Sequence, residues 1–456
     1  MFLEKIKSDG LAHLSYLLGD GLEAVVIDPR RDCQIYIDIA ARHRTRISRI
    51  FETHRNEDYI IGSLELAKRT GATIHHGKAL DFSYGQAVSE NDVFEVGELR
   101  LSILETPGHT FESISIVVTD KNFGDDPVAV FSGDALMIGD VGRTDFFPDL
   151  AEEVAGALYD SIFDKLLPLG DQTILYPAHG AGSVCGDSMA SREFSTIGHE
   201  RRNNPVVQKT DRDDFIRFKV QEHHYLPPYF KKMEEYNQQG PPPLHFLPQP
   251  PPMNAPAVHK AQQQGALLLD LRSPEAYAGA FIPGSLAMPL EMISAYTGYL
   301  IDYDTELILI PETAEQIKPA VEQLLRLGFD RLPGYLKGGM HSWEVNGFQY
   351  DQVGAVHASD LVQRLQEKKD FTLLDVRQIK EYKEGRLPGA THIFLGELQA
   401  RLDELDRKKP IVTFCGSGVR AIIAASILKR NGFLQVENSL GSMEACSSIG
   451  CPLTKG

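Results

Sequence analysis

Short apolar runs alternate with polar segments through roughly the first 180 residues. Six of these runs have the length and composition of strands, at residues 24–28, 50–54, 72–76, 99–106, 129–132 and 173–177. Four of them run straight into polar sequences that contain His or Asp, namely ETHRNED, TPGHT, SGDAL and YPAHG. Because a rigid sheet holds the base of such loops, they often carry functional side chains. The pattern predicts that the chemistry of this region lies at strand ends.

The last 200 residues contain an internal repeat with an offset of about 105 residues. The sequence LLLDLRSPEAYAGAFIPG (267–284) aligns with TLLDVRQIKEYKEGRLPG (372–389). In each copy an apolar strand and an amphipathic segment precede a second buried strand, at 307–310 and 411–414, and then a helix that ends near Gly-Phe. Strands that alternate with helices indicate a parallel sheet with helices on both faces. The period is too long for a solenoid and predicts a duplicated domain.

A proline-rich segment separates the two regions, with the sequence GPPPLHFLPQPPPMNAP at 240–256. Such a proline density interrupts helices and central strands and favours an extended, semi-rigid connector. The fold class predicted is therefore α/β and multidomain. We expect domains at 1–240, 257–352 and 353–456, with a linker at 241–256.

Composition narrows the classes of partner. The 46 basic and 63 acidic residues give a net charge of −17, which disfavours nucleic acid because its phosphates are repelled. No apolar stretch approaches the length of a membrane span, and the N-terminus has no apolar leader, so we expect neither a membrane nor a secretory location. The five cysteines are sparse and irregularly spaced, as in a reducing compartment, and this predicts a cytoplasmic protein.

Five strand-end side chains form a candidate metal site: His54, Asp58, His109, Asp134 and His179. A single histidine after a strand is usually a hydrogen-bonding loop residue. Five imidazole and carboxylate groups, each just beyond an apolar strand, point instead to metal ligands.

The motifs around these residues resemble the metallo-β-lactamase superfamily. They read HRNEDY from His54, TPGHT, SGD and YPAH, and DVGRTD at 140–145 narrows the resemblance to the persulfide dioxygenase branch. The resemblance covers about residues 1–240 and implies an αββα sandwich with the site at one edge of the sheets.

Two departures from the superfamily pattern bear on the metal. Asn56 and Tyr59 stand where a two-metal hydrolase has histidines. His54, His109 and Asp134 remain, and two histidines with one carboxylate form the facial triad of non-haem Fe(II) oxygenases. The resemblance implies one Fe(II) per chain, with zinc as the alternative. We expect three further side chains to lie around these ligands and orient them, namely Asp58, Tyr59 and His179.

The resemblance also implies the first reaction, in which a low-molecular-weight thiol persulfide and O₂ give sulfite and the thiol. Arg143 and Asp145 are candidates for binding the substrate. The Arg143 guanidinium suits a carboxylate or phosphate of the carrier thiol. A structural bridge between Arg143 and Asp145 is an equal alternative.

Cys415 is a candidate nucleophile. It follows the apolar strand IVTF and begins a loop that precedes the helical sequence AIIAASIL. Backbone N–H groups and the positive end of a helix stabilise a thiolate in such a setting. The residues we assign to this loop are Gly416, Ser417, Gly418, Val419 and the cationic Arg420.

This loop resembles that of the rhodanese sulfurtransferases, which carry a persulfide on the loop cysteine. Ser442 departs from the family, which commonly has Gly there, and we expect it to be peripheral to the loop. In the first repeat Pro311 aligns with Cys415 and the glycines are absent, so that copy is predicted to be a pseudo-rhodanese. The domain order resembles bacterial persulfide dioxygenase–sulfurtransferase fusions.

The sequence thus predicts a bifunctional enzyme that makes sulfite at iron and exchanges sulfane sulfur between sulfite and thiosulfate at Cys415. Two alternatives stay open: a glyoxalase II-like thioester hydrolase fused to a sulfurtransferase, and a non-catalytic persulfide-binding or sensing protein. The sequence is compatible with several carrier thiols. It is also compatible with a homo-oligomer.

Overall fold

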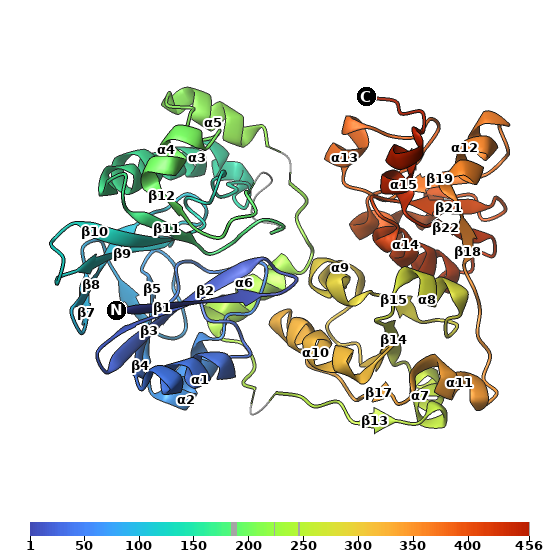
Figure 1. Ribbon diagram of the computed structural model, residues 1–456, viewed down its shortest axis with the longest axis horizontal. Helices are drawn as coiled ribbons and strands as arrows, with labels where there is room; N and C mark the ends of the chain where they lie inside the picture. Colours follow the sequence, from blue (N-terminus) through green and yellow to red (C-terminus); the bar gives the residue numbers. More distant parts are fainter. Residues whose placement is uncertain (184–188, 223, 245–246, 456) are drawn as a thin grey trace. The chain divides into compact units, whose positions relative to one another are not determined.

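The computed structural model describes residues 1–183, 189–222, 224–244 and 247–455, so Cys185 lies outside the described residues (Figure 1). The chain forms two compact units. The first comprises Met1–Leu247 and Leu325–Gly328, and the second comprises Pro248–Leu324 and Phe329–Gly456.

Two six-stranded sheets form the first unit, counted over the described residues, with strand orders β1-β2-β3-β4-β5-β6 and β12-β11-β10-β9-β8-β7. The strands of the first sheet are β1 (Phe2–Ser8), β2 (His13–Asp20), β3 (Glu23–Ile27), β4 (Arg46–Phe51), β5 (Thr73–Gly77) and β6 (Gln86–Val88). Those of the second are β7 (Val93–Val96), β8 (Leu99–Glu105), β9 (Ile114–Asp120), β10 (Pro127–Gly133), β11 (Ile174–Pro177) and β12 (Ser195–Thr196).

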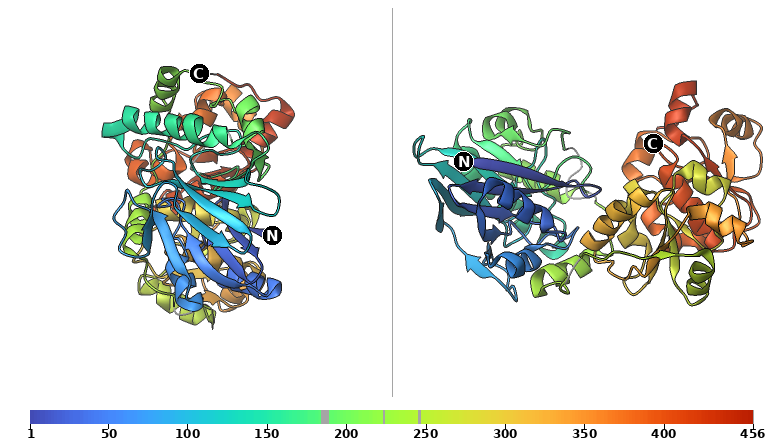
Figure 2. Two further views of the ribbon diagram at one scale, coloured as in Figure 1. Left: turned by 90° about the vertical axis from the view of Figure 1, so that its left-hand side faces the viewer. Right: turned by 60° about the horizontal axis from the view of Figure 1, so that its bottom comes forward.

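Apolar side chains from both sheets meet in one core between them, which includes Phe51 of the first sheet and Phe131 of the second. The outer face of the first sheet packs against α1 (Gln34–His43) and α2 (Ser63–Thr70). The outer face of the second packs against α3 (Ala151–Asp160) and the segments after it. This layering, which can be followed in Figure 2, confirms the predicted αββα sandwich.

The pattern of apolar runs located six strands to within a few residues but missed the antiparallel edges. The hairpin of β1 and β2 and the meander β7-β8-β9 were not predicted. β9 is buried along its whole length, so its run of apolar residues shows no period of two. The remaining helical elements are η1 (Pro148–Leu150), the π-helix η2 (Ser161–Leu166), η3 (Leu167–Leu169), α4 (Ile197–Asn203), α5 (Arg212–Val220) and α6 (Phe230–Gln239).

The second unit contains, in its described part, two five-stranded sheets with the same topology, β13-β17-β16-β14-β15 and β18-β22-β21-β19-β20. The first is built from β13 (Pro252–Met253), β14 (Leu267–Asp270), β15 (Leu286–Ala287), β16 (Leu307–Ile310) and β17 (Gly334–Leu336). The second is built from β18 (Gly354–Val356), β19 (Thr372–Asp375), β20 (Thr391–His392), β21 (Ile411–Phe414) and β22 (Val436–Ser439). All their pairings are parallel, which confirms the predicted duplication and sheet type.

Helices flank these parallel sheets (Figure 1), and β16 and β21 are buried at every position. In the first repeat they are α7 (Ala255–Gln263), α8 (Pro274–Gly279), η4 (Leu290–Met292), α9 (Ile293–Leu300), η5 (Ala314–Gln316), α10 (Ile317–Arg326) and α11 (Gly339–Val345). In the second they are α12 (Ala358–Gln366), α13 (Ile379–Glu384), η6 (Leu395–Glu404), α14 (Val419–Arg430) and α15 (Ser442–Ile449). Within the described ranges, no helix has the length and apolar character that crossing a membrane requires.

The residues that match between the repeats have structural roles. Arg272 binds both oxygens of Asp270 at 2.8 and 2.7 Å, and Arg377 binds those of Asp375 at 2.9 and 2.6 Å. Each guanidinium also donates to a backbone carbonyl eight residues further on, at 2.8 Å in both repeats. Both repeats have this Asp–Arg ion pair. The pair is therefore a feature of the fold that the repeats share and does not indicate activity.

The predicted linker is shorter than 241–256. Pro252 and Met253 form β13, which pairs in parallel with β17, and α7 begins at Ala255 with Asn254 as its cap. Proline is tolerated at such an edge strand because its nitrogen faces away from the sheet. Because the prolines indicated an extended connector, β13 and the start of α7 were assigned to the linker.

Candidate metal centre and sulfur-transfer loop

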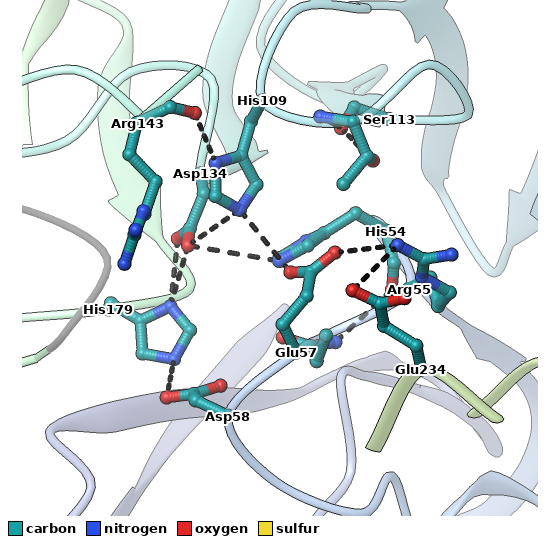
Figure 3. A network of polar contacts seen from close by, with 12 residues as sticks. His54, Arg55, Glu57, Asp58, His109, Ser113, Asp134, Arg143, His179 and Glu234 are labelled. Carbon is teal, nitrogen blue, oxygen red and sulfur yellow. Dashed lines mark hydrogen bonds and ion pairs between the residues drawn. The ribbon is translucent and has the colours of Figure 1, made fainter. Parts of the chain in front are cut away.

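His54, His109 and Asp134 come together beyond the ends of β4, β8 and β10 (Figure 3). Their ligand atoms all lie within 4.8 Å of one another. Asp134 Oδ2 is 3.8 Å from His54 Nε2 and 3.5 Å from His109 Nε2. All three side chains are buried, so water does not compete freely for these groups.

Hydrogen bonds at Nδ1 set the orientation of both imidazoles. His109 Nδ1 lies 3.0 Å from the carbonyl oxygen of Arg143, to which it donates. Thr53 Oγ1 donates to Asp28, so it accepts from His54 Nδ1 at 2.9 Å. Both Nε2 lone pairs then face the centre, as metal-ligating imidazoles require.

A glycine allows the backbone to approach His109. A Cβ on Gly142 would lie closer to the backbone oxygen of Asp134 than side chains tolerate, and 3.0 Å from His109 Nδ1. This glycine belongs to the DVGRTD sequence, whose following carbonyl, that of Arg143, accepts the hydrogen bond from His109.

The electrostatics of the three side chains suit a cation. Burial lowers the pKa of His54 to about 3 and also lowers that of His109, so both are neutral near pH 7. Burial raises the pKa of Asp134, but its interaction with His179 outweighs burial and leaves the pKa well below the usual range. Neither Nε2 atom has a hydrogen-bond partner among the described residues. Two imidazole lone pairs and a carboxylate that face one another repel unless a metal ion lies between them, so these residues fit a divalent metal.

His179 contacts the candidate ligand Asp134, and Asp58 contacts His179. His179 Nδ1 lies 2.9 Å from both oxygens of Asp134, and its Nε2 lies 3.1 Å from Asp58 Oδ2. Burial lowers the pKa of His179, but these two carboxylates together raise it well above its ordinary value. Tyr59 is buried, and its ring lies tilted against His13 with centroids 4.0 Å apart and edge-on to His179 at 6.4 Å, so it contacts His179 and, among its described interactions, none of the three candidate ligands.

Glu57 was missed by the sequence analysis. Its side chain is fully buried, with Oε2 3.7 Å from His109 Nε2 and Oε1 3.3 Å from the Arg55 guanidinium. The sequence signal for Glu57 is its place in HRNEDY, between Asn56 and Asp58.

Arg143 supports the loop that bears Asp145. Its guanidinium binds both oxygens of Asp145 at 2.7 Å, and the side chain is 1% exposed. The ring of Phe146 lies 4.9 Å from the guanidinium carbon. The geometry is that of the structural bridge, the alternative to binding the carrier thiol.

The Cys415 loop brings a backbone N–H group to the cysteine sulfur. Cys415 follows β21 and is buried, and the Gly418 N–H donates to its Sγ at 3.1 Å. Gly418 has φ of +104°, which glycine adopts without steric cost, and α14 begins at Val419. Gly416 lies against the Arg420 guanidinium, and Ser417 is exposed.

Ser442 contacts this loop directly, so the expectation that it is peripheral was wrong. Its Oγ accepts a hydrogen bond from the Cys415 N–H at 3.1 Å and donates to the Ser439 carbonyl at 2.7 Å. Ser442 has φ of +39°, and Gly339 in the first repeat has φ of +57°. The hydrogen bonds of the hydroxyl offset a backbone conformation that favours glycine.

Two further side chains near Arg420 were also missed. Glu381 accepts from two nitrogens of the Arg420 guanidinium, at 2.7 and 2.8 Å, so this cation pairs with a carboxylate of the protein itself. Tyr296, on α9 of the first repeat, packs near Phe394 of the second. Burial raises the pKa of Tyr296 to about 12, against the influence of Arg420, which bonds to it. Pro311 follows β16 where Cys415 follows β21.

Comparisons with known proteins divide the chain in the same way. Residues 8–179 match the metallo-beta-lactamase superfamily, and residues 254–346 and 357–448 each match the rhodanese-like domain. The mitochondrial persulfide dioxygenase ETHE1 of Bos taurus is 30% identical over 199 residues, which are 42% of this chain and 70% of that protein. The putative sulfur carrier protein YrkF of Bacillus subtilis (strain 168) is 35% identical over 107 residues, 24% of this chain and 56% of that protein.

Among solved structures, a metallo-beta-lactamase from Staphylococcus aureus subsp. aureus COL is 31% identical with a TM-score of 0.66. The similarity covers 74% of this chain and 98% of that chain, and so extends well beyond the sandwich.

Proposed function

Because the chain belongs to the metallo-β-lactamase superfamily and carries two rhodanese-like domains after that domain, we propose that it is a bifunctional persulfide dioxygenase and sulfurtransferase. The observation that carries the proposal is the set His54, His109 and Asp134, with Asn56 and Tyr59 where a second metal would need imidazoles.

His54, His109 and Asp134 would hold one Fe(II). With three protein ligands the ion supplies open positions at which O₂ and a soft sulfur anion can react. The overall reaction is R–S–S⁻ + O₂ + H₂O → R–SH + SO₃²⁻ + H⁺, in which the terminal sulfur is oxidised and O₂ is reduced.

The residues of the chain provide the surroundings for this reaction. His54 and His109 are held as neutral ligands by their Nδ1 hydrogen bonds, and His179 orients Asp134. Burial of the three side chains keeps bulk water from the reacting groups.

Cys415 would carry the second activity. Its thiolate attacks the outer sulfur of thiosulfate, S₂O₃²⁻ + Cys–S⁻ ⇌ Cys–S–S⁻ + SO₃²⁻, and the reverse reaction makes thiosulfate from sulfite. The Gly418 N–H and the N-terminus of α14 stabilise the negative sulfur.

Metal analysis of anaerobically purified protein, followed by oxygen uptake with persulfides of glutathione, coenzyme A and bacillithiol, tests the first activity. One iron per chain and uptake with at least one persulfide are expected. Two zinc ions with thioester hydrolysis would favour the glyoxalase II-like alternative. A metal-loaded protein without oxygen uptake would favour a persulfide-binding protein.

A further inference from the structure

We propose that Glu57 belongs to the metal centre, as a second carboxylate that faces the metal ion from outside the triad of His54, His109 and Asp134. The inference rests on the proposed function only in requiring a divalent metal at the triad. It holds whichever metal is bound and whichever reaction follows.

Glu57 lies nearly as close to one candidate ligand as Asp134 does. Its Oε2 lies 3.7 Å from His109 Nε2, and Asp134 Oδ2 lies 3.5 Å from the same nitrogen. Figure 3 shows the Glu57 carboxylate reaching toward the space where His54 and His109 point. His109 Nε2 therefore has a carboxylate oxygen on two sides.

The hydrogen bonds of Glu57 leave one oxygen without a partner. Oε1 accepts from the Arg55 guanidinium at 3.3 Å. Oε2 has no hydrogen-bond partner among the described residues, although the side chain is fully buried. A buried carboxylate oxygen without a donor is costly, and a metal ion at the triad removes that cost.

The Arg55 guanidinium is shared between Glu57 and a second carboxylate. The same guanidinium nitrogen lies 3.6 Å from Glu234, and the Arg55 backbone N–H donates to Glu112 at 2.9 Å. The guanidinium is thus shared between Glu57 and Glu234 and reaches only Oε1 of Glu57, so Oε2 has no cationic partner among the described residues. A metal dication is the group of opposite charge that this arrangement fits.

A carboxylate near the metal also affects how an anionic substrate approaches. A carboxylate beside one side of the metal repels an anion that approaches from that side. Glu57 thus strengthens metal binding and disfavours an anion on its own side of the metal.

The test compares Glu57→Gln with Glu234→Gln, which makes the same chemical change at the other carboxylate that contacts Arg55. Chelator competition with Fe(II), and separately with Co(II), measures metal affinity without any assay of turnover. Glu57→Gln should weaken binding about 10–100-fold, as loss of groups around metal ligands typically does, and should change the visible spectrum of the Co(II) protein. Glu234→Gln should leave both unchanged.

Thermal unfolding separates this role from a structural one. Without metal, Glu57→Gln should be at least as stable as the unaltered protein, because a buried carboxyl oxygen without a donor has gone, and it should gain less stability on adding metal. If Glu57→Gln lowers stability equally with and without metal, or keeps full metal affinity and the same Co(II) spectrum, the proposal is wrong. If it folds poorly, Glu57→Asp, which keeps the charge, must bind metal more tightly than Glu57→Ala. If the metal-binding results are as expected but the protein takes up no oxygen, the proposed function is contradicted and the role of Glu57 is not.

Discussion

His179 places its Nδ1 2.9 Å from both carboxylate oxygens of Asp134, and one of those oxygens, Oδ2, is the atom that faces His54 and His109. On its other side His179 Nε2 lies 3.1 Å from Asp58. His179 is thus flanked by two carboxylates. Its position is that of a group that orients the ligand Asp134.

Replacing His179 should therefore weaken metal binding without abolishing it. We expect His179→Ala to lower the affinity for Fe(II) about 10–100-fold, because Asp134 loses the partner that holds both its oxygens. Chelator competition under anaerobic conditions measures this. If His179→Ala loses metal as completely as Asp134→Ala, then His179 is itself a ligand.

The metal content should be one iron per chain, and His109→Ala should lose iron and oxygen uptake together, because the variant removes one of three ligands. Elemental analysis and an oxygen electrode give the two values for the same sample. Full oxygen uptake in His109→Ala would refute the assignment.

The first repeat should have no sulfurtransferase activity, because Pro311 supplies neither a thiol nor a backbone N–H at the position of Cys415. Cys415→Ser leaves only this repeat to act. The assay is sulfur transfer from thiosulfate to cyanide, with unaltered protein as the positive control. Substantial residual transfer in Cys415→Ser would show that the first repeat is active.

The two activities should be coupled through sulfite. Given a persulfide and O₂, the unaltered protein should yield mainly thiosulfate, because sulfite accepts the sulfane sulfur carried on Cys415. Cys415→Ser should still consume O₂ but should stop at sulfite. Quantifying both anions after thiol derivatisation distinguishes the outcomes, and an unchanged thiosulfate yield, beyond the uncatalysed reaction, would leave two independent activities.

Ser442 allows its hydrogen bond to be separated from its backbone strain. Ser442→Ala loses the bond to the Cys415 N–H and keeps the positive φ, which should lower the free energy of unfolding by about 0.5–1.5 kcal/mol. Ser442→Gly loses the same bond but adopts the positive φ without steric cost, so it should be the more stable of the two. Denaturant unfolding measures the difference. Sulfur transfer should fall equally in both variants, and full activity in both would contradict a role in holding Cys415.

Some features of this protein were open to prediction because they are local. His54, His109 and Asp134 each follow an apolar run, and the run itself indicates the strand whose end positions the side chain. The repeat was visible because an Asp–Arg brace, two residues apart, recurs 105 residues later. The glycines of the Cys415 loop likewise indicate a local backbone conformation that glycine adopts without steric cost.

By itself, the sequence determined the fold class, the duplicated domain and the strand ends at which the candidate ligands lie. Only the tertiary structure decided what each polar side chain faces. Arg420 binds Glu381, Ser442 holds the Cys415 amide, and Glu57 turns one oxygen toward His109. The physical reason is that periodicity encodes which positions are buried, whereas a buried polar group takes its partner from whatever distant segment the packing brings within hydrogen-bonding distance.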